Sequence, residues 1–243
     1  MLYAEEWQPT KFELHRGGWR GSRDANQLGA GSRLMADRIG AAYTRALRQH
    51  AHGALLDVGC GHVPLYGCYR DLVADVTCVD WPNTEHPSPH VDVYADLGRP
   101  LPLPDAGYHT IVATDVLEHL PYPDVLWGEV RRLLRPEGKV IVGVPFMYWL
   151  HERPHDHHRY TEHRLRLFCA DHGFTVLSCD PYGGASDVAA DVASKIAEVV
   201  GLRTLASFIG WLALRRTRVE ERTPMPLGYV LVAQKPAATA AHG

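Results

Sequence analysis

The sequence lacks several features that define common classes of protein. Its five cysteines stand singly, at positions 60, 68, 78, 169 and 179, with no Cys-x-x-Cys pair. This odd number of separated cysteines argues against both a disulfide framework and a thiolate zinc site. The net charge is −3, so there is no basic excess to hold a nucleic-acid backbone. Residues 1–14 have neither the basic nor the apolar segment of a secretion signal, and we expect a cytoplasmic protein.

A long hydrophobic run without charges is also missing. The most apolar stretch, 196–214, contains Glu198 and Arg203, each of which would cost about 2.5–3.5 kcal/mol at the centre of a bilayer. We therefore expect no transmembrane segment. Apolar residues at helical spacing over 188–212 predict two packed helices joined near Gly201. A cap over an acceptor pocket, a homodimer surface and attachment to a lipid surface remain open as roles for these helices.

What the sequence does contain is an alternation of strands and helices. Short apolar runs predict strands at 54–59, 75–80, 90–96, 109–115, 139–145, 174–180 and 229–235, and helical patterns fall at 32–51, 65–73, 122–135 and 159–174. Ser32 and Thr161 are candidate caps for the first and last of these helices. The alternation predicts a doubly wound α/β fold with a mostly parallel sheet, whose ligands lie beyond the carboxyl ends of the strands.

We expect a single domain of 243 residues with four parts. They are an N-terminal arm and helix (1–52), a cofactor-binding core (53–180), a helical cap or interface segment (181–226), and the last strand with an alanine-rich tail (227–243).

The end of the first predicted strand carries a candidate cofactor turn. Gly59 and Gly61 allow a tight turn and a close approach to a ligand, while Pro64 replaces the third glycine of a dinucleotide fingerprint. Asp80 ends the second strand, nineteen residues after Gly61, where a carboxylate can accept hydrogen bonds from both hydroxyls of a ribose. Trp81 offers a flat face for an adenine, with packing as the alternative role.

The third predicted strand ends in Asp96. Its carboxylate can accept a hydrogen bond from an exocyclic amine, and the backbone of Leu97 can read the edge of the ring.

Five motifs in order carry a resemblance to a known family: LLDVGCG, VD, ADL, ATDVLEHL and LLRPEGKVIVGVP. Together they resemble the class I S-adenosylmethionine-dependent methyltransferases, in their small-molecule and glycan (methyltransferase type 11-like) variety. The resemblance implies a Rossmann-like seven-stranded sheet with an antiparallel last strand. It also implies S-adenosylmethionine as the cofactor, held by residues from four strand ends: Asp57, Gly59 and Gly61 at the methionine portion, Asp80 at the ribose, Asp96 and Leu97 at the adenine, and Thr114, Asp115 and His119 at the methionine and sulfonium end.

The segment HERPHDHHRYT, residues 151–161, concentrates histidines after the fifth predicted strand. His151 and His155 have helical spacing, but Pro154 makes a regular helix there doubtful, and we expect no metal site. The segment is similar to an acceptor-facing wall in part of the family, which implies substrate contacts for Tyr148, Trp149, His151, His155 and Tyr160. Asp156 and Arg159 are expected to pair and brace the loop.

The function expected is methyl transfer from S-adenosylmethionine to an oxygen or nitrogen of a small-molecule acceptor. A histidine suits the removal of a hydroxyl proton, and His151 or His155 is the expected base, with His119 next. Two alternatives stay open. One is an enzyme of the same fold that uses the cofactor for cyclisation or rearrangement, and the other is a non-catalytic scaffold subunit.

Overall fold

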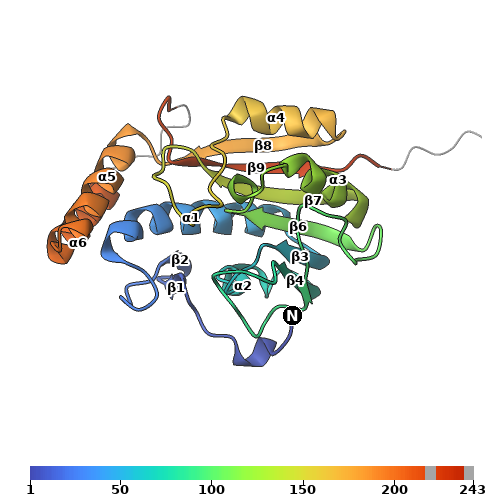
Figure 1. Ribbon diagram of the computed structural model, residues 1–243, viewed down its shortest axis with the longest axis horizontal. Helices are drawn as coiled ribbons and strands as arrows, with labels where there is room; N and C mark the ends of the chain where they lie inside the picture. Colours follow the sequence, from blue (N-terminus) through green and yellow to red (C-terminus); the bar gives the residue numbers. More distant parts are fainter. Residues whose placement is uncertain (217–222, 238–243) are drawn as a thin grey trace, which may run out of the picture.

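A computed structural model describes residues 1–216 and 223–237 of the chain. A seven-stranded sheet forms its centre, in the order β5-β4-β3-β6-β7-β9-β8 (Figure 1). The strands are β3 (Ala54–Val58), β4 (Asp75–Asp80), β5 (Val93–Tyr94), β6 (Tyr108–Thr114), β7 (Leu134–Pro145), β8 (Thr175–Tyr182) and β9 (Gly228–Gln234). All neighbouring strands are parallel except β9, which is antiparallel to both β7 and β8. The predicted Rossmann-like sheet with an antiparallel last strand is confirmed.

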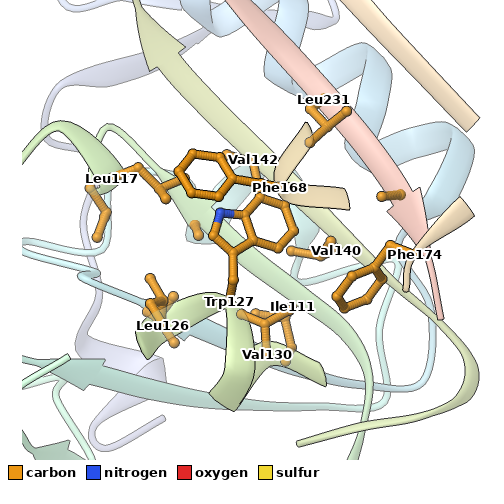
Figure 2. Packing of buried hydrophobic residues seen from close by; sticks show 14 of the residues in the cluster. Ile111, Leu117, Leu126, Trp127, Val130, Val140, Val142, Phe168, Phe174 and Leu231 are labelled. Atoms are coloured by element: carbon orange, nitrogen blue, oxygen red, sulfur yellow. The ribbon is translucent and has the colours of Figure 1, made fainter. Parts of the chain in front are cut away.

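Two groups of helices cover the two faces of the sheet. Helices α3 (Pro123–Leu133) and α4 (Glu162–Asp171) pack on one face, where Trp127 stacks on Phe168 with ring centroids 5.7 Å apart (Figure 2). Helices α1 (Arg33–His50) and α2 (Tyr66–Tyr69) pack on the other face. Because successive strand residues alternate between the faces, Leu56 joins the first cluster and Leu55 the second.

The chain reverses its direction of travel across the sheet between β3 and β6. From β3 it proceeds through β4 to the β5 edge, and it then returns to the other side of β3 with β6 and β7. The connections that leave the carboxyl ends of β3 and β6 therefore run in opposite directions. The crevice between these two strand ends is a topological switch point, where open α/β sheets form their ligand sites.

The N-terminal arm contains regular structure. A short 3-10 helix, η1 (Ala4–Glu6), precedes a hairpin of β1 (Phe12–His15) and β2 (Gly18–Gly21), which packs against α1. The side chain of Phe12 is buried in the second cluster. This contact connects the arm to the core.

Of the two residues predicted to cap a helix, one does so and the other does not. Thr161 caps α4, because its hydroxyl accepts a hydrogen bond from the backbone N–H of Arg164 at 3.3 Å. The prediction for Ser32 was wrong, since its side chain makes no capping hydrogen bond. A 3-10 helix, η2 (Ala30–Ser32), leads directly into α1 and leaves Ser32 in a helical conformation instead of the extended one that a capping residue adopts.

Several helices and strands have other bounds in the structure than the sequence predicts. The helix expected at 65–73 is the single turn of α2, and the strand expected at 90–96 is the two-residue β5. The prediction placed the end of one helix at 135 and the start of the next strand at 139, whereas α3 ends at Leu133 and β7 begins at Leu134. A register irregularity between β6 and β7 accommodates Pro136 and Gly138 within this longer strand.

Helices α5 (Ala185–Val199) and α6 (Arg203–Arg216) form the predicted helical pair, joined through Gly201 at φ +83°. The pair lies beside the start of α1 (Figure 1). The carboxylate of Glu198 accepts hydrogen bonds from the backbone N–H groups of Ala30 and Gly31, at 2.9 and 2.8 Å. Among the described residues, no helix is long and apolar enough to span a bilayer. Residues 217–222 of the predicted helical segment and 238–243 of the predicted tail lie outside the described residues.

Candidate active site

The glycine turn after β3 has the conformation that its sequence predicts. Gly59 and Gly61 adopt φ values of +67° and +51°, which favour glycine. A Cβ atom on Gly59 would lie 2.4 Å from Cγ2 of Val116. The backbone N–H of Gly59 donates to the carbonyl of Val79 at 2.8 Å, and this bond holds the turn against β4.

A cavity of about 520 Å³ opens at the switch point. This volume lies in the range of small-molecule sites. It brings together five of the residues predicted to bind the cofactor: Asp57, Gly59, Gly61, Thr114 and Asp115.

The cavity also has walls that the sequence analysis did not assign to the site. The N-terminal arm contributes Lys11, and residues 151–161, which we call the histidine loop, contribute Glu152. The segment after β4 contributes His86. The cavity is therefore closed by segments far from the glycine turn in sequence.

The two aspartates at the ends of β3 and β4 differ in their partners. Oδ2 of Asp57 accepts a hydrogen bond from the hydroxyl of Tyr69 at 2.8 Å, and burial raises the pKa of Asp57 to about 7. Oδ1 of Asp80 accepts from the backbone N–H of Trp81 at 2.8 Å, whereas its buried Oδ2 has no hydrogen-bond partner in the described part of the chain. Burial raises the pKa of Asp80 as well. A buried carboxylate oxygen without a donor fits a ligand that brings hydroxyl groups.

The residues predicted for the adenine lie at the ends of β4 and β5. Trp81 is partly exposed and meets the ring of His155 edge-on, with centroids 5.4 Å apart. The carboxylate of Asp96 accepts from the backbone N–H of Gly98 at 2.8 Å. Leu97 is buried, so only its backbone is a candidate contact. None of these residues is part of the cavity lining described above.

Asp115 connects the end of β6 to the N-terminal part of the chain. It follows Thr114 directly and adopts a φ of +55°. Its Oδ1 accepts from the hydroxyl of Tyr43 at 2.8 Å, and its Oδ2 lies 3.2 Å from Nζ of Lys11. Burial and the neighbouring carboxylate raise the pKa of Tyr43 well above its usual value. Both carboxylate oxygens thus have partners on α1 or the arm, which close this side of the cavity.

The histidine loop is braced as expected. The guanidinium of Arg159 forms a two-pronged ion pair with Asp156, with one N–H···O distance of 2.8 Å. The pair of hydrogen bonds and the nearby His151 hold the pKa of Asp156 well below its usual value. Arg159 also donates to the carbonyl of Trp149 at 2.9 Å. In addition, the backbone N–H of His157 donates to the carbonyl of Glu118 at 2.8 Å, which fixes the loop to the segment that follows β6.

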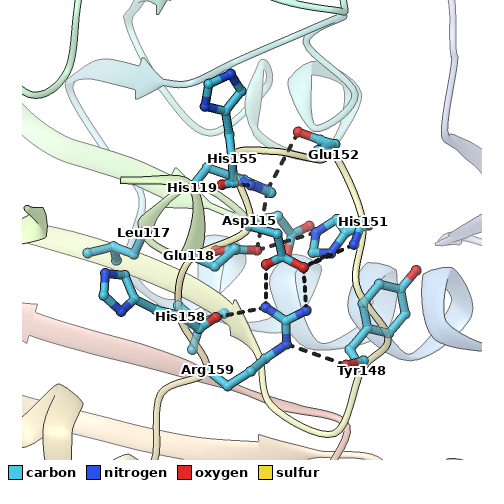
Figure 3. A network of polar contacts seen from close by, with 12 residues as sticks. Asp115, Leu117, Glu118, His119, Tyr148, His151, Glu152, His155, His158 and Arg159 are labelled. Carbon is cyan, nitrogen blue, oxygen red and sulfur yellow. Dashed lines mark hydrogen bonds and ion pairs between the residues drawn. The ribbon is translucent and has the colours of Figure 1, made fainter. Parts of the chain in front are cut away.

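The loop and the 3-10 helix η3 (Leu117–His119) bring three side chains together (Figure 3). Glu118 is fully buried, and neither of its carboxylate oxygens has a hydrogen-bond partner among the described residues. Nε2 of His119 and Nε2 of His151 lie 3.9 and 4.0 Å from its Oε1. The two imidazole rings meet edge-on, with centroids 4.9 Å apart. We refer to Glu118, His119 and His151 as the Glu–His–His cluster.

The remaining residues predicted to contact the substrate separate into two places. Tyr148 and Trp149 line a second, more apolar cavity of about 460 Å³ against α5. Tyr160 is only 4% exposed and donates its hydroxyl to the carbonyl of Leu117 at 3.0 Å. Its side chain is therefore part of the core between the sheet and α4, and we do not include it among the residues that face a substrate.

Glu118, Lys11 and Tyr43 are site residues that are not among those predicted from the sequence. Glu118 stands inside the DVLEH motif, where its charge beside His119 was the available signal. Lys11 and Tyr43 gave no local signal, because only the fold brings them to Asp115.

Residues 32–179 match the family described as "Methyltransferase domain". The match spans more than half of the chain, and the protein belongs to this family. The prediction of S-adenosylmethionine as the cofactor is confirmed by the family.

One curated relative is a protein of Mycolicibacterium smegmatis described as "Probable S-adenosylmethionine-dependent methyltransferase". It is 33% identical over 112 residues, which are 42% of this chain and 42% of the relative. The matched segment is thus less than half of either protein.

Two solved structures are similar in fold. The [4+2]-cyclase SpnF aligns with a TM-score of 0.54 at 20% identity, over 94% of this chain and 89% of SpnF. A SAM-dependent methyltransferase from Archaeoglobus fulgidus aligns with a TM-score of 0.52 at 15% identity, over 84% of this chain and 97% of that protein. At these identities the likeness shows the fold alone.

Proposed function

We propose that the protein transfers the methyl group of S-adenosylmethionine to an oxygen or nitrogen of a small-molecule acceptor. The observation that carries this proposal is the cavity at the switch point, in which the glycine turn and Thr114 face the histidine loop. A cofactor held by the turn would have its reactive end beside Asp115 and the loop. The acceptor would then enter from the loop side.

On the cofactor side, Asp80 would accept hydrogen bonds from the ribose hydroxyls. Its Oδ2 is buried and has no hydrogen-bond partner among residues 1–216 and 223–237, and its Oδ1 is already held by the N–H of Trp81. The carboxylate is therefore oriented before the ligand binds, which lowers the entropy that binding must overcome. Gly61 leaves the approach open, because a Cβ atom there would meet only the side chain of His86, at 3.6 Å.

S-adenosylmethionine supplies an electrophilic methyl group, and its transfer is an in-line displacement that requires an acceptor lone pair opposite the sulfur. The acceptor oxygen or nitrogen would form a new bond to the methyl carbon. The bond between that carbon and sulfur would break, and the electron pair of the broken bond would stay on sulfur. A hydroxyl acceptor also loses a proton, which a neighbouring group must assist.

Of the three candidate histidines, His119 and His151 are better placed than His155 to assist the acceptor. Both belong to the Glu–His–His cluster, and Nε2 of His119 lies 3.5 Å from Oε2 of Glu152, which lines the cavity. The ring of His155 instead packs on Trp81 and points away from Glu118 (Figure 3). Tyr148 and Trp149 would contact apolar parts of an acceptor in the second cavity.

The proposal is tested by incubating the purified chain with methyl-labelled S-adenosylmethionine and a panel of small phenols, sugars and amines. We expect S-adenosylhomocysteine to form together with one labelled acceptor. Conversion of an acceptor without loss of the methyl group from the cofactor would contradict methyl transfer. Bound cofactor without turnover on any acceptor would favour a binding role.

A further inference from the structure

The Glu–His–His cluster contains a buried carboxylate that shares a nearby positive charge, Arg159, with another carboxylate. Glu118 is 0% exposed, and neither oxygen has a hydrogen-bond donor within the described ranges. Arg159 is already engaged by the carboxylate of Asp156. A buried carboxylate without a hydrogen bond is unfavourable, and a cation bound in contact with it would compensate its charge.

Both histidines turn Nε2 toward this carboxylate. Nδ1 of His119 lies 3.0 Å from the carbonyl oxygen of His155, to which it can only donate, so a neutral ring there carries its lone pair on Nε2. Nδ1 of His151 lies 3.3 Å from Oδ2 of Asp156 but makes no hydrogen bond with the described residues, and its Nε2 lies 4.0 Å from Oε1 of Glu118. His119 is held as histidine ligands of metals are, with one nitrogen on a carbonyl oxygen and the other directed to the metal.

The distances are too long for hydrogen bonds but close to those of a metal site. Nε2 of each histidine lies 3.9–4.0 Å from Oε1 of Glu118, and the three atoms all lie within 4.8 Å of one another. Ligand atoms about 2.0–2.2 Å from a tetrahedral ion are themselves about 3.4 Å apart. Small side-chain movements would therefore bring all three atoms into coordination.

We propose that Glu118, His119 and His151 bind one divalent first-row transition-metal ion beside the cofactor cavity. Two imidazole nitrogens and one carboxylate oxygen suit zinc, iron, cobalt or manganese, whereas magnesium and calcium prefer oxygen ligands alone. Three protein ligands leave coordination positions open for another molecule. Glu152, which lines the cavity and lies 3.5 Å from Nε2 of His119, marks the side from which that molecule reaches the ion.

This inference revises the expectation that the histidine loop holds no metal. Within the loop alone, Pro154 disfavours a helical pair of histidine ligands. The two further candidate ligands, Glu118 and His119, come from η3, which follows the neighbouring strand β6.

The role of the ion rests on the proposed function. A bound cation would coordinate the hydroxyl oxygen of the acceptor and lower its pKa. The hydroxyl proton would pass to water, the oxygen would take the methyl group, and the electron pair of the broken bond would remain on sulfur.

Metal binding is tested without the cofactor. The full chain is stripped with a chelator and titrated calorimetrically with Zn²⁺, and Co²⁺ is added separately to follow its visible spectrum. We expect about one equivalent of Zn²⁺ and a Co²⁺ spectrum typical of nitrogen and oxygen ligands. Glu118→Gln should weaken the binding of Zn²⁺ and of Co²⁺ at least ~10-fold. This substitution keeps the size of the side chain and removes only its charge, and thermal unfolding of the variant is recorded to confirm that it folds.

The matched control is His157→Gln, an exposed histidine of the same loop outside the cluster, which should bind both ions like the parent. Failure of the parent to bind Zn²⁺ and Co²⁺, or equal binding by Glu118→Gln, overturns the inference. Loss of S-adenosylmethionine affinity without loss of metal affinity in Glu118→Gln also overturns it, because Glu118 would then balance the sulfonium. Metal binding by a chain that transfers no methyl group contradicts the proposed function alone.

Discussion

The two sides of the cavity are built in different ways. The cofactor side is formed by the ends of β3, β4 and β6, whose backbone is held by parallel strand pairing on both sides of β3. The acceptor side is a loop without regular structure, held by the Asp156–Arg159 pair and by backbone bonds to Glu118. Changes on the cofactor side should therefore alter binding of S-adenosylmethionine, and changes on the acceptor side should alter turnover.

The largest effect is expected for His151→Gln. Loss of this imidazole removes either a base or a metal ligand, and groups in such roles typically contribute about 10²–10⁴-fold to the rate. We expect kcat to fall by at least ~10²-fold while the Kd for S-adenosylmethionine stays near that of the parent. His155→Gln is the matched variant in the same loop and should lose much less. Equal losses in the two variants would remove the distinction between the two histidines.

Asp80→Ala should weaken the binding of S-adenosylmethionine and leave the histidine loop of the acceptor side unchanged. Hydrogen bonds to a charged group contribute about 1.5–3 kcal/mol, so the Kd measured by calorimetry should rise roughly 10- to 150-fold. Asp180→Ala, an exposed aspartate on the distant edge strand β8, serves as the control. An unchanged Kd for Asp80→Ala would mean that the ribose lies elsewhere.

Asp57 should make the stability of the cofactor side depend on pH. Burial raises the folded-state pKa of this carboxyl to about 7 from its ordinary value of 3.8, so between these values the folded state binds a proton that the unfolded state has lost. The free energy of unfolding should then fall as pH rises through this interval, by about 1.4 kcal/mol per pH unit.

Asp57→Asn removes this titration and keeps an oxygen for the hydroxyl of Tyr69. Its stability relative to the parent, measured by urea unfolding at pH 5, 6 and 7, should increase with pH. The same series on Asp180→Asn should show no such trend. A parent and an Asp57→Asn variant with parallel profiles would show that Asp57 keeps an ordinary pKa.

The smallest effect is expected on the outer face of α5. Val199 is 73% exposed, whereas Val188 on the same helix is 8% exposed. Val199→Thr should change the free energy of unfolding by less than about 0.5 kcal/mol, as surface substitutions usually do, and Val188→Thr should cost more. A large loss for Val199→Thr, with a Tm that depends on protein concentration, would instead indicate that a second chain covers this face.

Much of the cofactor side could be predicted from the sequence. The sequence predicts the glycine turn at 59 and 61 and the aspartate at 80 that ends β4, and outside the cofactor side it predicts the cap at Thr161; each has the predicted conformation or place. These features depend on residues within one or two turns of the chain. The place of Tyr160 could not be predicted from nearby residues in this way. Its side chain is buried by contacts with Phe168 and with Leu117, and Leu117 lies in a different segment of the chain.

Local sequence by itself determined the strands, the glycine turn and the strand-end carboxylates, since periodicity and backbone preference act over a few neighbouring residues. Only the tertiary structure decided that Lys11 reaches Asp115, 104 positions away, and that Glu118 is buried against His151 from a different segment. The physical reason is that burial and ion pairing depend on which segments the sheet brings together, and the sequence around Glu118 is the same whether its carboxylate meets water, a proton or a metal ion.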